Sequence, residues 1–204
     1  MTGGKGLAHA GNLALPDDDI QSPAMDISQL LAKLPEAGYP SARSDAAAHL
    51  VFDHQMQMGN LLTRIGWDAR VAAAQGDAAL TKALLANDAA DVADYMLFVD
   101  EAPLSAPVEA TAYAKAFSAQ GPRDGKGRGL YQLDLKTRLL AYPCSYMIYS
   151  EVFDALPEAA REAIYARMIT VLDSGKVREA QAVREILAAT KPSFRAFVQT
   201  RRAS

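Results

Sequence analysis

His54 and Met58 are the side chains whose types and spacing give the most direct route to metal or haem chemistry. They lie four residues apart, so on a helix the imidazole and the thioether would point into the same pocket. Haem that has a histidine and a methionine ligand needs them on opposite sides of the iron, so iron bound by His54 would take its second ligand from another segment. The alternative is a core histidine, hydrogen-bonded to a carboxylate or a carbonyl group, with Met58 as packing.

Cys144, the only cysteine, suggests a different chemistry. It follows Pro143 at the expected start of a helix, where free N–H groups and the helix dipole lower the pKa of a thiol. Such a thiol suits a nucleophile or a redox group. A cysteine nucleophile also needs a nearby base, and His54 is the one well-placed candidate. The alternative is that Cys144 is a small buried residue.

Tyr146 belongs to an aromatic stripe that begins just before Cys144. The members of the stripe are spaced three or four residues apart: Tyr142, Tyr146, Tyr149 and Phe153. Buried phenols need hydrogen-bond partners. The stripe therefore predicts either the wall of a pocket for a flat or amphipathic ligand, or a core face whose hydroxyls reach water or carboxylates.

Two carboxylates, Asp100 and Glu101, close the expected helix 89–100. Negative charge at a helix C-terminus opposes the helix dipole, which costs roughly a few tenths of a kcal/mol for each exposed group. A compensating group is therefore expected: an arginine, the N-terminus of another helix or a cation. Arg64 and Arg138 are the arginines that we expect to pair with these carboxylates.

The segment 121–129 contains four glycines and three basic residues. It is not a Walker A sequence, because no Gly-Lys-Ser/Thr closes it and no strand leads into it. We expect a solvated, mobile turn, and the alternative is a cradle whose backbone N–H groups bind an anion.

Helix-forming residues dominate from residue 26 onward, and no long period-2 run typical of a strand occurs. We therefore predict an all-α fold, with a single multi-helix domain over 26–204 packed around one long central helix. A flexible, irregular N-terminal arm over 1–25 precedes it. The expected helices are 27–33, 45–75, 78–86, 89–100, 107–119, 130–141, 144–155, 158–173, 177–190 and 193–201.

The expected helix 45–75 has apolar side chains on two sides, which is typical of a central helix with neighbours on both. One arc holds Ala47, Leu50, Val51, His54, Met58, Leu61, Leu62 and Ile65, and the opposite side holds Phe52, Met56, Thr63 and Trp67. The polar line between these two sides is formed by Asp53, Gln57, Asn60 and Arg64. On a central helix these groups must satisfy one another, because an unpaired buried polar group costs about 1–3 kcal/mol.

The composition excludes several classes of function. The 204 residues carry a formal net charge of −3, which provides no bulk attraction for nucleic acid. No apolar run approaches the roughly 18–20 residues that a membrane span needs. The haem-attachment sequence C-x-x-C-H is absent, so we expect no covalent haem, whereas non-covalent haem or a metal ion on His54 stays a hypothesis.

Several segments resemble a group of uncharacterised bacterial proteins. Residues 54–67 read H-Q-x-x-M-x-N-L-x-T-R-x-G-W, and residues 142–150 read Y-P-C-S-Y-x-I-Y-S. Further similar segments are LFVDEAPL at 97–104, GPRD at 121–124 and DLKTR at 134–138, so the resemblance runs over about residues 26–192. The proteins of this group are generally longer at the N-terminus, exported, and often encoded among c-type cytochromes. The resemblance implies a periplasmic or exported setting and a c-type cytochrome or other redox partner, but no catalytic residue.

Three hypotheses of function follow. The first is a helical binding or accessory domain without a complete catalytic site of its own, which docks a redox partner or holds a small ligand. The second is a haem- or metal-binding redox protein that uses His54 as a ligand, and the third is a structural domain of a larger assembly. The candidate ligand- or partner-binding residues are His54, Gln57, Met58, Asn60, Arg64, Asp100, Glu101, Arg138, Cys144 and Tyr146.

The start of the chain bears on its location. No signal peptide precedes Pro16, since this stretch contains one lysine and no apolar run of the required length. We therefore expect a cytoplasmic location if this is the whole chain, and a periplasmic or exported one if it is part of a longer protein.

Overall fold

The computed structural model describes residues 45–76 and 78–203, and the residues from Ala46 onward belong to one compact unit. This unit is all-α, as predicted. Among the described residues, the one strand-like pairing is an isolated antiparallel bridge between Leu133 and Leu140. The predicted arm over 1–25 and the predicted helix 27–33 lie outside the described residues.

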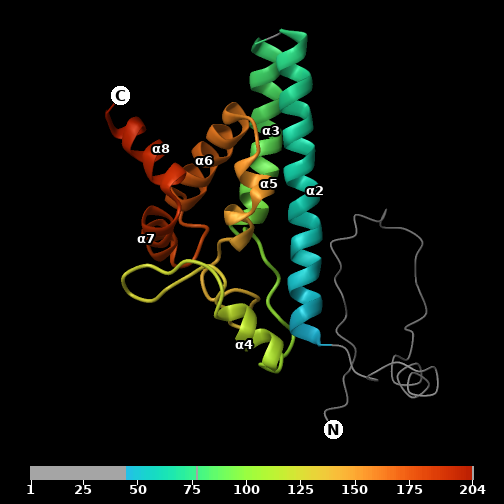
Figure 1. Ribbon diagram of the computed structural model, residues 1–204, viewed down its shortest axis with the longest axis vertical. Coiled ribbons are helices and arrows are strands. Elements are labelled where there is room, and N and C mark those ends of the chain that lie inside the picture. Colours follow the sequence, from blue (N-terminus) through green and yellow to red (C-terminus); the bar gives the residue numbers. More distant parts are fainter. Residues whose placement is uncertain (1–44, 77, 204) are drawn as a thin grey trace, which may run out of the picture. The chain divides into compact units, whose positions relative to one another are not determined.

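Two long helices form a hairpin (Figure 1): α2, Ala46–Gln75, and α3, Ala78–Met96. Gly76 follows α2 with a φ of 71°, a left-handed conformation that glycine adopts without strain at the end of a helix. The predicted helix 45–75 is confirmed. The two helices predicted over 78–86 and 89–100 are one helix, because no glycine or proline separates them.

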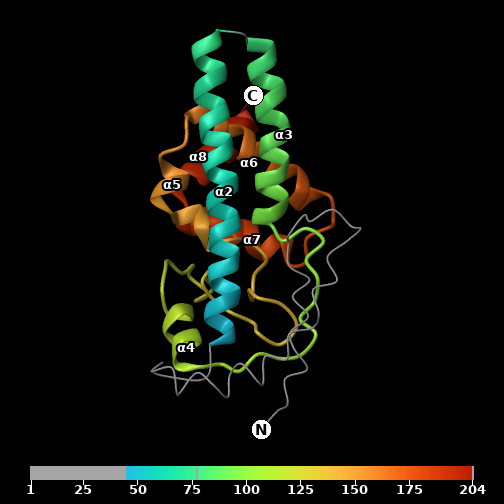
Figure 2. The same cartoon turned by 90° about the vertical axis from the view of Figure 1, so that its right-hand side faces the viewer.

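Three helices from the C-terminal part of the chain complete the helical layer. They are α6, Glu158–Asp173, which packs against α3, and then α7, Ala180–Thr190, and α8, Pro192–Ala203. In Figure 2 they lie behind the α2–α3 hairpin. Pro157 precedes α6 and Pro192 opens α8, where the missing N–H group has no intrahelical partner to lose. The structure thus confirms these helices, with boundaries shifted by up to three residues.

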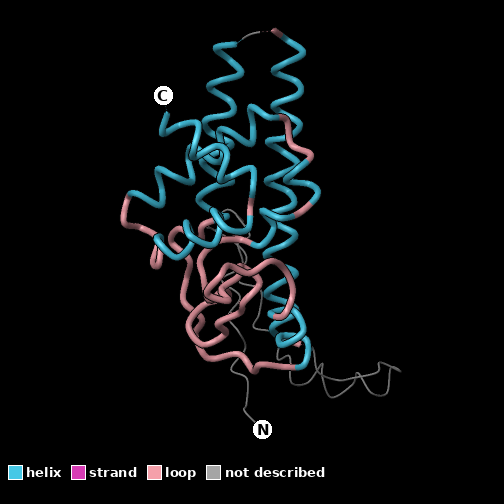
Figure 3. Tube along the Cα trace, turned by 60° about the vertical axis from the view of Figure 1, so that its left-hand side comes forward, coloured by secondary structure: helices cyan, strands magenta, loops and turns pink. Residues whose placement is uncertain are grey.

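The remaining elements are short. They are α4, Ala112–Ser118, the 3-10 helix η1, Tyr146–Tyr149, and α5, Glu151–Asp154. Long loops connect them, and Figure 3 shows these loops gathered around the N-terminal half of α2.

The predicted helix 130–141 is wrong. The carboxylate of Asp134 accepts hydrogen bonds from the backbone N–H groups of Thr137 and Arg138 (2.9 and 3.2 Å), which closes a turn instead of a helix. Leu135 has a left-handed φ of 58°. Side-chain oxygens of this kind compete with helical hydrogen bonds for the backbone.

The predicted helix 144–155 is broken into two short helices. The hydroxyl of Ser145 caps η1 by accepting a hydrogen bond from the Met147 N–H, and the hydroxyl of Ser150 caps α5 by accepting one from the Phe153 N–H. Each serine has an extended backbone, so each begins a new element. Thr111 acts in the same way for α4, which begins later than predicted.

The prediction that α2 is a central helix is wrong. Its buried residues recur every three or four positions, on one face only: Ala47, Val51, His54, Met58, Leu61, Leu62, Ile65, Gly66, Ala69 and Ala72. On the opposite side, Phe52, Met56 and Trp67 are 57%, 52% and 67% exposed. Among the described helices, those that pack on α2 are α3, α4, α5 and α6.

The polar line is therefore not buried. Asp53, Asn60 and Arg64 are exposed, and Gln57 is half-buried. The prediction of a buried network among these four side chains is wrong, because they lie outside the buried face of α2.

None of the helices described here is long and apolar enough to cross a membrane.

Candidate functional site

His54 is the buried centre of an aromatic cluster, with 3% of its surface exposed. Its imidazole stacks on the rings of Tyr95 and Phe98, with centroid distances of 5.2 and 4.8 Å, and meets the edge of Tyr146 at 5.7 Å. α2 supplies the imidazole, α3 and the turn that follows it supply two of the rings, and η1 supplies the third. The cluster thus joins three segments that are far apart in the sequence.

The imidazole has a defined polar partner. His54 Nε2 lies 2.7 Å from the hydroxyl oxygen of Ser145. That oxygen accepts a hydrogen bond from the Met147 N–H, so its own hydrogen is available to Nε2. Burial lowers the pKa of His54 from 6.5 to about 4, so the imidazole is neutral at pH 7 and can accept this hydrogen bond.

This geometry favours the core interpretation of His54. The partner is a serine hydroxyl, and not the carboxylate or carbonyl group that the sequence suggested. Met58 is fully buried one turn further along α2. Within residues 45–76 and 78–203, no group of three or more His, Cys, Asp or Glu side chains could hold a metal ion.

Cys144 does not have the environment expected for a reactive thiol. It is fully buried and precedes the cap of η1, so it does not lie at the N-terminus of a helix. Burial raises the pKa of its thiol well above the ordinary value. The hypothesis of a lowered thiol pKa is wrong, and the interpretation of Cys144 as a small buried residue is confirmed, since a buried thiol without a nearby positive charge stays protonated.

Tyr146 is part of the core and not of a pocket wall. Its ring is buried against Phe117 and Tyr131, both at centroid distances of 4.9 Å. Its hydroxyl donates a hydrogen bond to the carbonyl oxygen of Val51 on α2 at 3.2 Å. Tyr146 therefore belongs to a core face, and its phenol hydrogen-bonds to the backbone of α2.

Arg64 pairs with α3, and not with Asp100 or Glu101. Its Nη2 lies 2.5 Å from an oxygen of Asp91, and its Nε lies 3.4 Å from an oxygen of Asp88. α3 ends at Met96, so the two predicted partners lie in the turns beyond it. The predicted pairing of Arg64 with Asp100 or Glu101 is wrong. In the antiparallel hairpin of α2 and α3, Arg64 lies beside the middle of α3.

Arg138 pairs with Glu179, with Nη2 at 2.7 Å from Oε2. Glu101 is half-buried and accepts a hydrogen bond from the Leu139 N–H at 3.4 Å. Burial raises the pKa of Glu101, and the charge of Arg138 acts in the opposite direction. Asp100 is exposed, with a left-handed φ of 58°. Arg138 thus influences Glu101 through space, but its ion pair is with Glu179.

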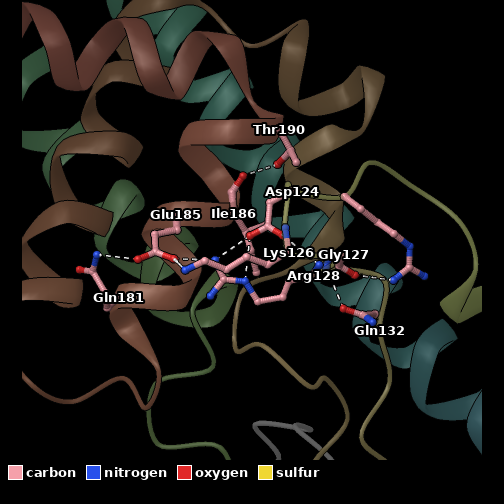
Figure 4. Close-up of polar contacts among 11 residues, drawn as sticks. Asp124, Lys126, Gly127, Arg128, Gln132, Gln181, Glu185, Ile186 and Thr190 are labelled. Atoms are coloured by element: carbon pink, nitrogen blue, oxygen red, sulfur yellow. Dashed lines mark hydrogen bonds and ion pairs between the residues drawn. The ribbon is translucent and has the colours of Figure 1, made fainter.

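The glycine-rich segment 121–129 satisfies its own polar groups (Figure 4). Asp124 accepts hydrogen bonds from the backbone N–H groups of Lys126 and Arg128, both at 2.9 Å. The side chains of Lys126 and Arg128 contact one oxygen of Glu185 on α7, at 2.8 and 2.6 Å. Hydrogen bonds from Lys126 and then Arg128 lower the pKa of Glu185 to about 2. Carboxylates of the chain itself therefore occupy the N–H and cationic groups that the alternative of an anion cradle would need.

The surface that sequence reasoning misjudged is the outer face of α2, which we define as Phe52, Met56, Thr63 and Trp67. The periodicity placed these residues together on one side of the helix, which is correct. It could not show that no other described helix covers them. Their exposure makes them the strongest candidates for contact with another molecule.

Comparisons with protein-family models, with curated proteins and with solved structures match none of them to this chain.

Asp88, on α3 beside Arg64, has a raised carboxyl pKa. Burial raises the pKa of Asp88, and the neighbouring carboxylates Asp68 and Asp91 raise it further, whereas Arg64 lowers it. A raised carboxyl pKa means that the folded protein binds the proton more tightly than the unfolded chain. The stability that the protonated Asp88 carboxyl provides is therefore lost as the pH rises through its raised pKa. An asparagine at this position does not ionise, so the variant avoids this loss.

We expect Asp88→Asn to raise the melting temperature at pH 7, measured by circular dichroism. The matched control is Asp91→Asn, because Asp91 pairs with the same arginine but its side chain is 61% exposed, against 14% for Asp88. The control should leave the melting temperature nearly unchanged. A lower melting temperature for Asp88→Asn than for the control would contradict the prediction.

Proposed function

We propose that this protein is a helical binding module that docks another protein on the outer face of α2. The observation that carries the proposal is the exposure of Phe52, Met56 and Trp67, each more than half exposed on one side of a 30-residue helix. Aromatic residues and methionine are enriched at protein interfaces, and tryptophan is the residue most often found to dominate binding energy.

The dimensions of the outer face suit a protein partner. Phe52 and Trp67 are fifteen residues apart, which corresponds to about 22 Å along a helix. Polar groups flank the apolar positions, with Asp53, Asn60 and Arg64 exposed beside them. An apolar centre with a polar rim is the usual anatomy of a protein interface. Arg64 also forms ion pairs with Asp88 and Asp91 of α3.

We further propose that the partner is a redox protein, specifically a c-type cytochrome. The support for this step is the resemblance of segments of the chain to bacterial proteins that are often encoded among c-type cytochromes. A periplasmic or exported location belongs to the same proposal, since it rests on the same resemblance.

Trp67 provides the test, because it is the only tryptophan in the sequence and lies on the outer face of α2. A c-type cytochrome from the source cell is titrated into the protein, and quenching of tryptophan fluorescence by the haem reports docking. Binding is measured in parallel by calorimetry, so that variants without Trp67 can be compared. We expect a saturable one-to-one complex.

Truncation of an anchor should weaken this complex strongly. Phe52→Ala and Trp67→Ala are each expected to lower the affinity at least tenfold, or about 1.4 kcal/mol or more, as for central anchor residues. The matched control is Val152→Ala, which truncates an apolar side chain that is 47% exposed on α5, outside the outer face. Equal effects of the control and the anchor variants, or no complex, would overturn the proposal.

A further inference from the structure

A groove of about 890 Å³ lies between the hairpin end of α2 and α3 and the helices α6 and α8. Seven of the sixteen residues that line it are alanines from α2, α3 and α6, and Leu85 and Phe197 add larger apolar surface. The short alanine side chains leave room between these helices. The groove is therefore a mostly apolar channel that runs beside α6 from Ala159 to Thr170, or about 16 Å.

The charged residues that line the groove are mainly basic. Lys82, Arg167 and Arg201 are set against one carboxylate, Glu162. Arg167 is held by Asp94, with Nη2 at 2.8 Å from Oδ2. Lys82 on α3 and Arg201 on α8 form no ion pair with another residue of the described chain. Two cations are thus available at the edges of an apolar surface.

We propose that this groove binds an aliphatic chain that ends in a carboxylate. The chain lies on the alanines, Leu85 and Phe197, and the carboxylate is bound by Lys82 and Arg201. Apolar burial supplies most of the affinity, and charge complementarity selects an anionic head group. Phe197 is the one aromatic residue among the lining residues, so an aliphatic ligand fits better than a flat aromatic one.

The size of the groove favours a small molecule over a protein. Its volume lies within the range of about 300–1,000 Å³ that is typical of small-molecule sites. A stable protein interface takes about 20–30 residues from each side, more than the sixteen that line the groove.

The groove is separate from the docking surface proposed above. It is lined by Ala72 and Ala73 of α2 and by Gly76 just beyond it, none of which belongs to the outer face of α2. The two proposals can therefore fail independently, and dodecanoate binding is measured without any protein partner.

The experiment is a calorimetric titration of the full chain with dodecanoate, below the concentration at which it forms micelles. Dodecyltrimethylammonium, which has the same chain length and a positive head group, and butyrate, which has the same head group and a short chain, are titrated in parallel. We expect one site for dodecanoate, binding of the cation that is at least tenfold weaker, and no measurable binding of butyrate.

Two variants test the position of the site. The double variant Lys82→Glu/Arg201→Glu should weaken dodecanoate binding about tenfold or more and favour the cationic surfactant. Ala163→Trp, at a half-buried position of α6 that lines the groove, should abolish binding of both by filling the groove. The matched controls are Lys176→Glu and Ala74→Trp, both exposed and outside the groove. Melting temperatures confirm that each variant is folded.

A single dodecanoate site that responds to the groove variants and not to the controls supports the proposal. No binding, several equivalent sites, equal affinity for the two surfactants, or binding unchanged in both groove variants overturns it.

Discussion

Replacing His54 by alanine is expected to lower the free energy of unfolding by about 3 kcal/mol, as for the truncation of other large buried side chains. The variant loses the ring that packs on Tyr95, Phe98 and Tyr146, and leaves a cavity between them. It also leaves the buried hydroxyl of Ser145 without its acceptor. Urea denaturation at pH 7, followed by far-UV circular dichroism, measures the loss.

A second variant separates the ring from its hydrogen bond. His54→Phe keeps an aromatic ring in the cluster and removes only the contact with Ser145, so we expect a loss of about 1 kcal/mol. His49→Ala serves as the control, because His49 is exposed on the same helix. If His54→Ala were no more destabilising than His49→Ala, the packing role assigned to His54 would be wrong.

Acidification from pH 7 to pH 4 is expected to remove about 3 kcal/mol of stability through His54 alone, because burial lowers its pKa from 6.5 to about 4. The unfolded chain takes up a proton on this histidine near pH 6.5, whereas the folded protein resists it down to about pH 4. The unfolded state therefore binds more protons in this window. Stability is fully present above pH 6.5 and falls as the pH drops toward 4.

The measurement is the difference between the unfolding free energies of wild type and His54→Phe from pH 7 to pH 4. The phenylalanine variant has no proton to bind at this position, so its stability should fall less steeply over this window. Glu185, whose pKa is lowered from 4.5 to about 2, is common to both proteins, so the stability that it loses below pH 4.5 cancels in this difference. Parallel pH profiles of the two proteins would show that His54 does not titrate as described.

The sequence predicts the long regular helices well and the segments between them poorly. The predicted ranges 45–75 and 158–173 match α2 and α6 almost to the residue, because Gly76 follows α2 and Pro157 precedes α6. The helices predicted over 130–141 and 144–155 fail, because helix-forming composition does not reveal that Asp134 and Ser150 will hydrogen-bond the backbone. Such local competition depends on which turn the rest of the chain stabilises.

The candidate site shows the same division. The periodicity placed His54 correctly on the buried face of α2. Its partner Ser145 is ninety-one residues away in the sequence, so the contact could not be predicted from a local pattern. The arginine partners were missed for a similar reason, since Arg64 meets whichever residues of α3 the hairpin register sets beside it. The outer face of α2 was identified as a group, and its exposure follows from packing that no local pattern encodes.

The aromatic cluster around His54 and Tyr146 has a consequence for how the molecule comes apart. The loops between α4 and η1 contain no helix, yet Tyr131 packs on Tyr146, which also contacts α2 through Val51. If these loops detached, the N-terminal half of α2 would lose its contacts with them, and aromatic rings of the loops and of α2 would become exposed. We therefore expect the loops and the α2–α3 hairpin to unfold together, as one cooperative unit.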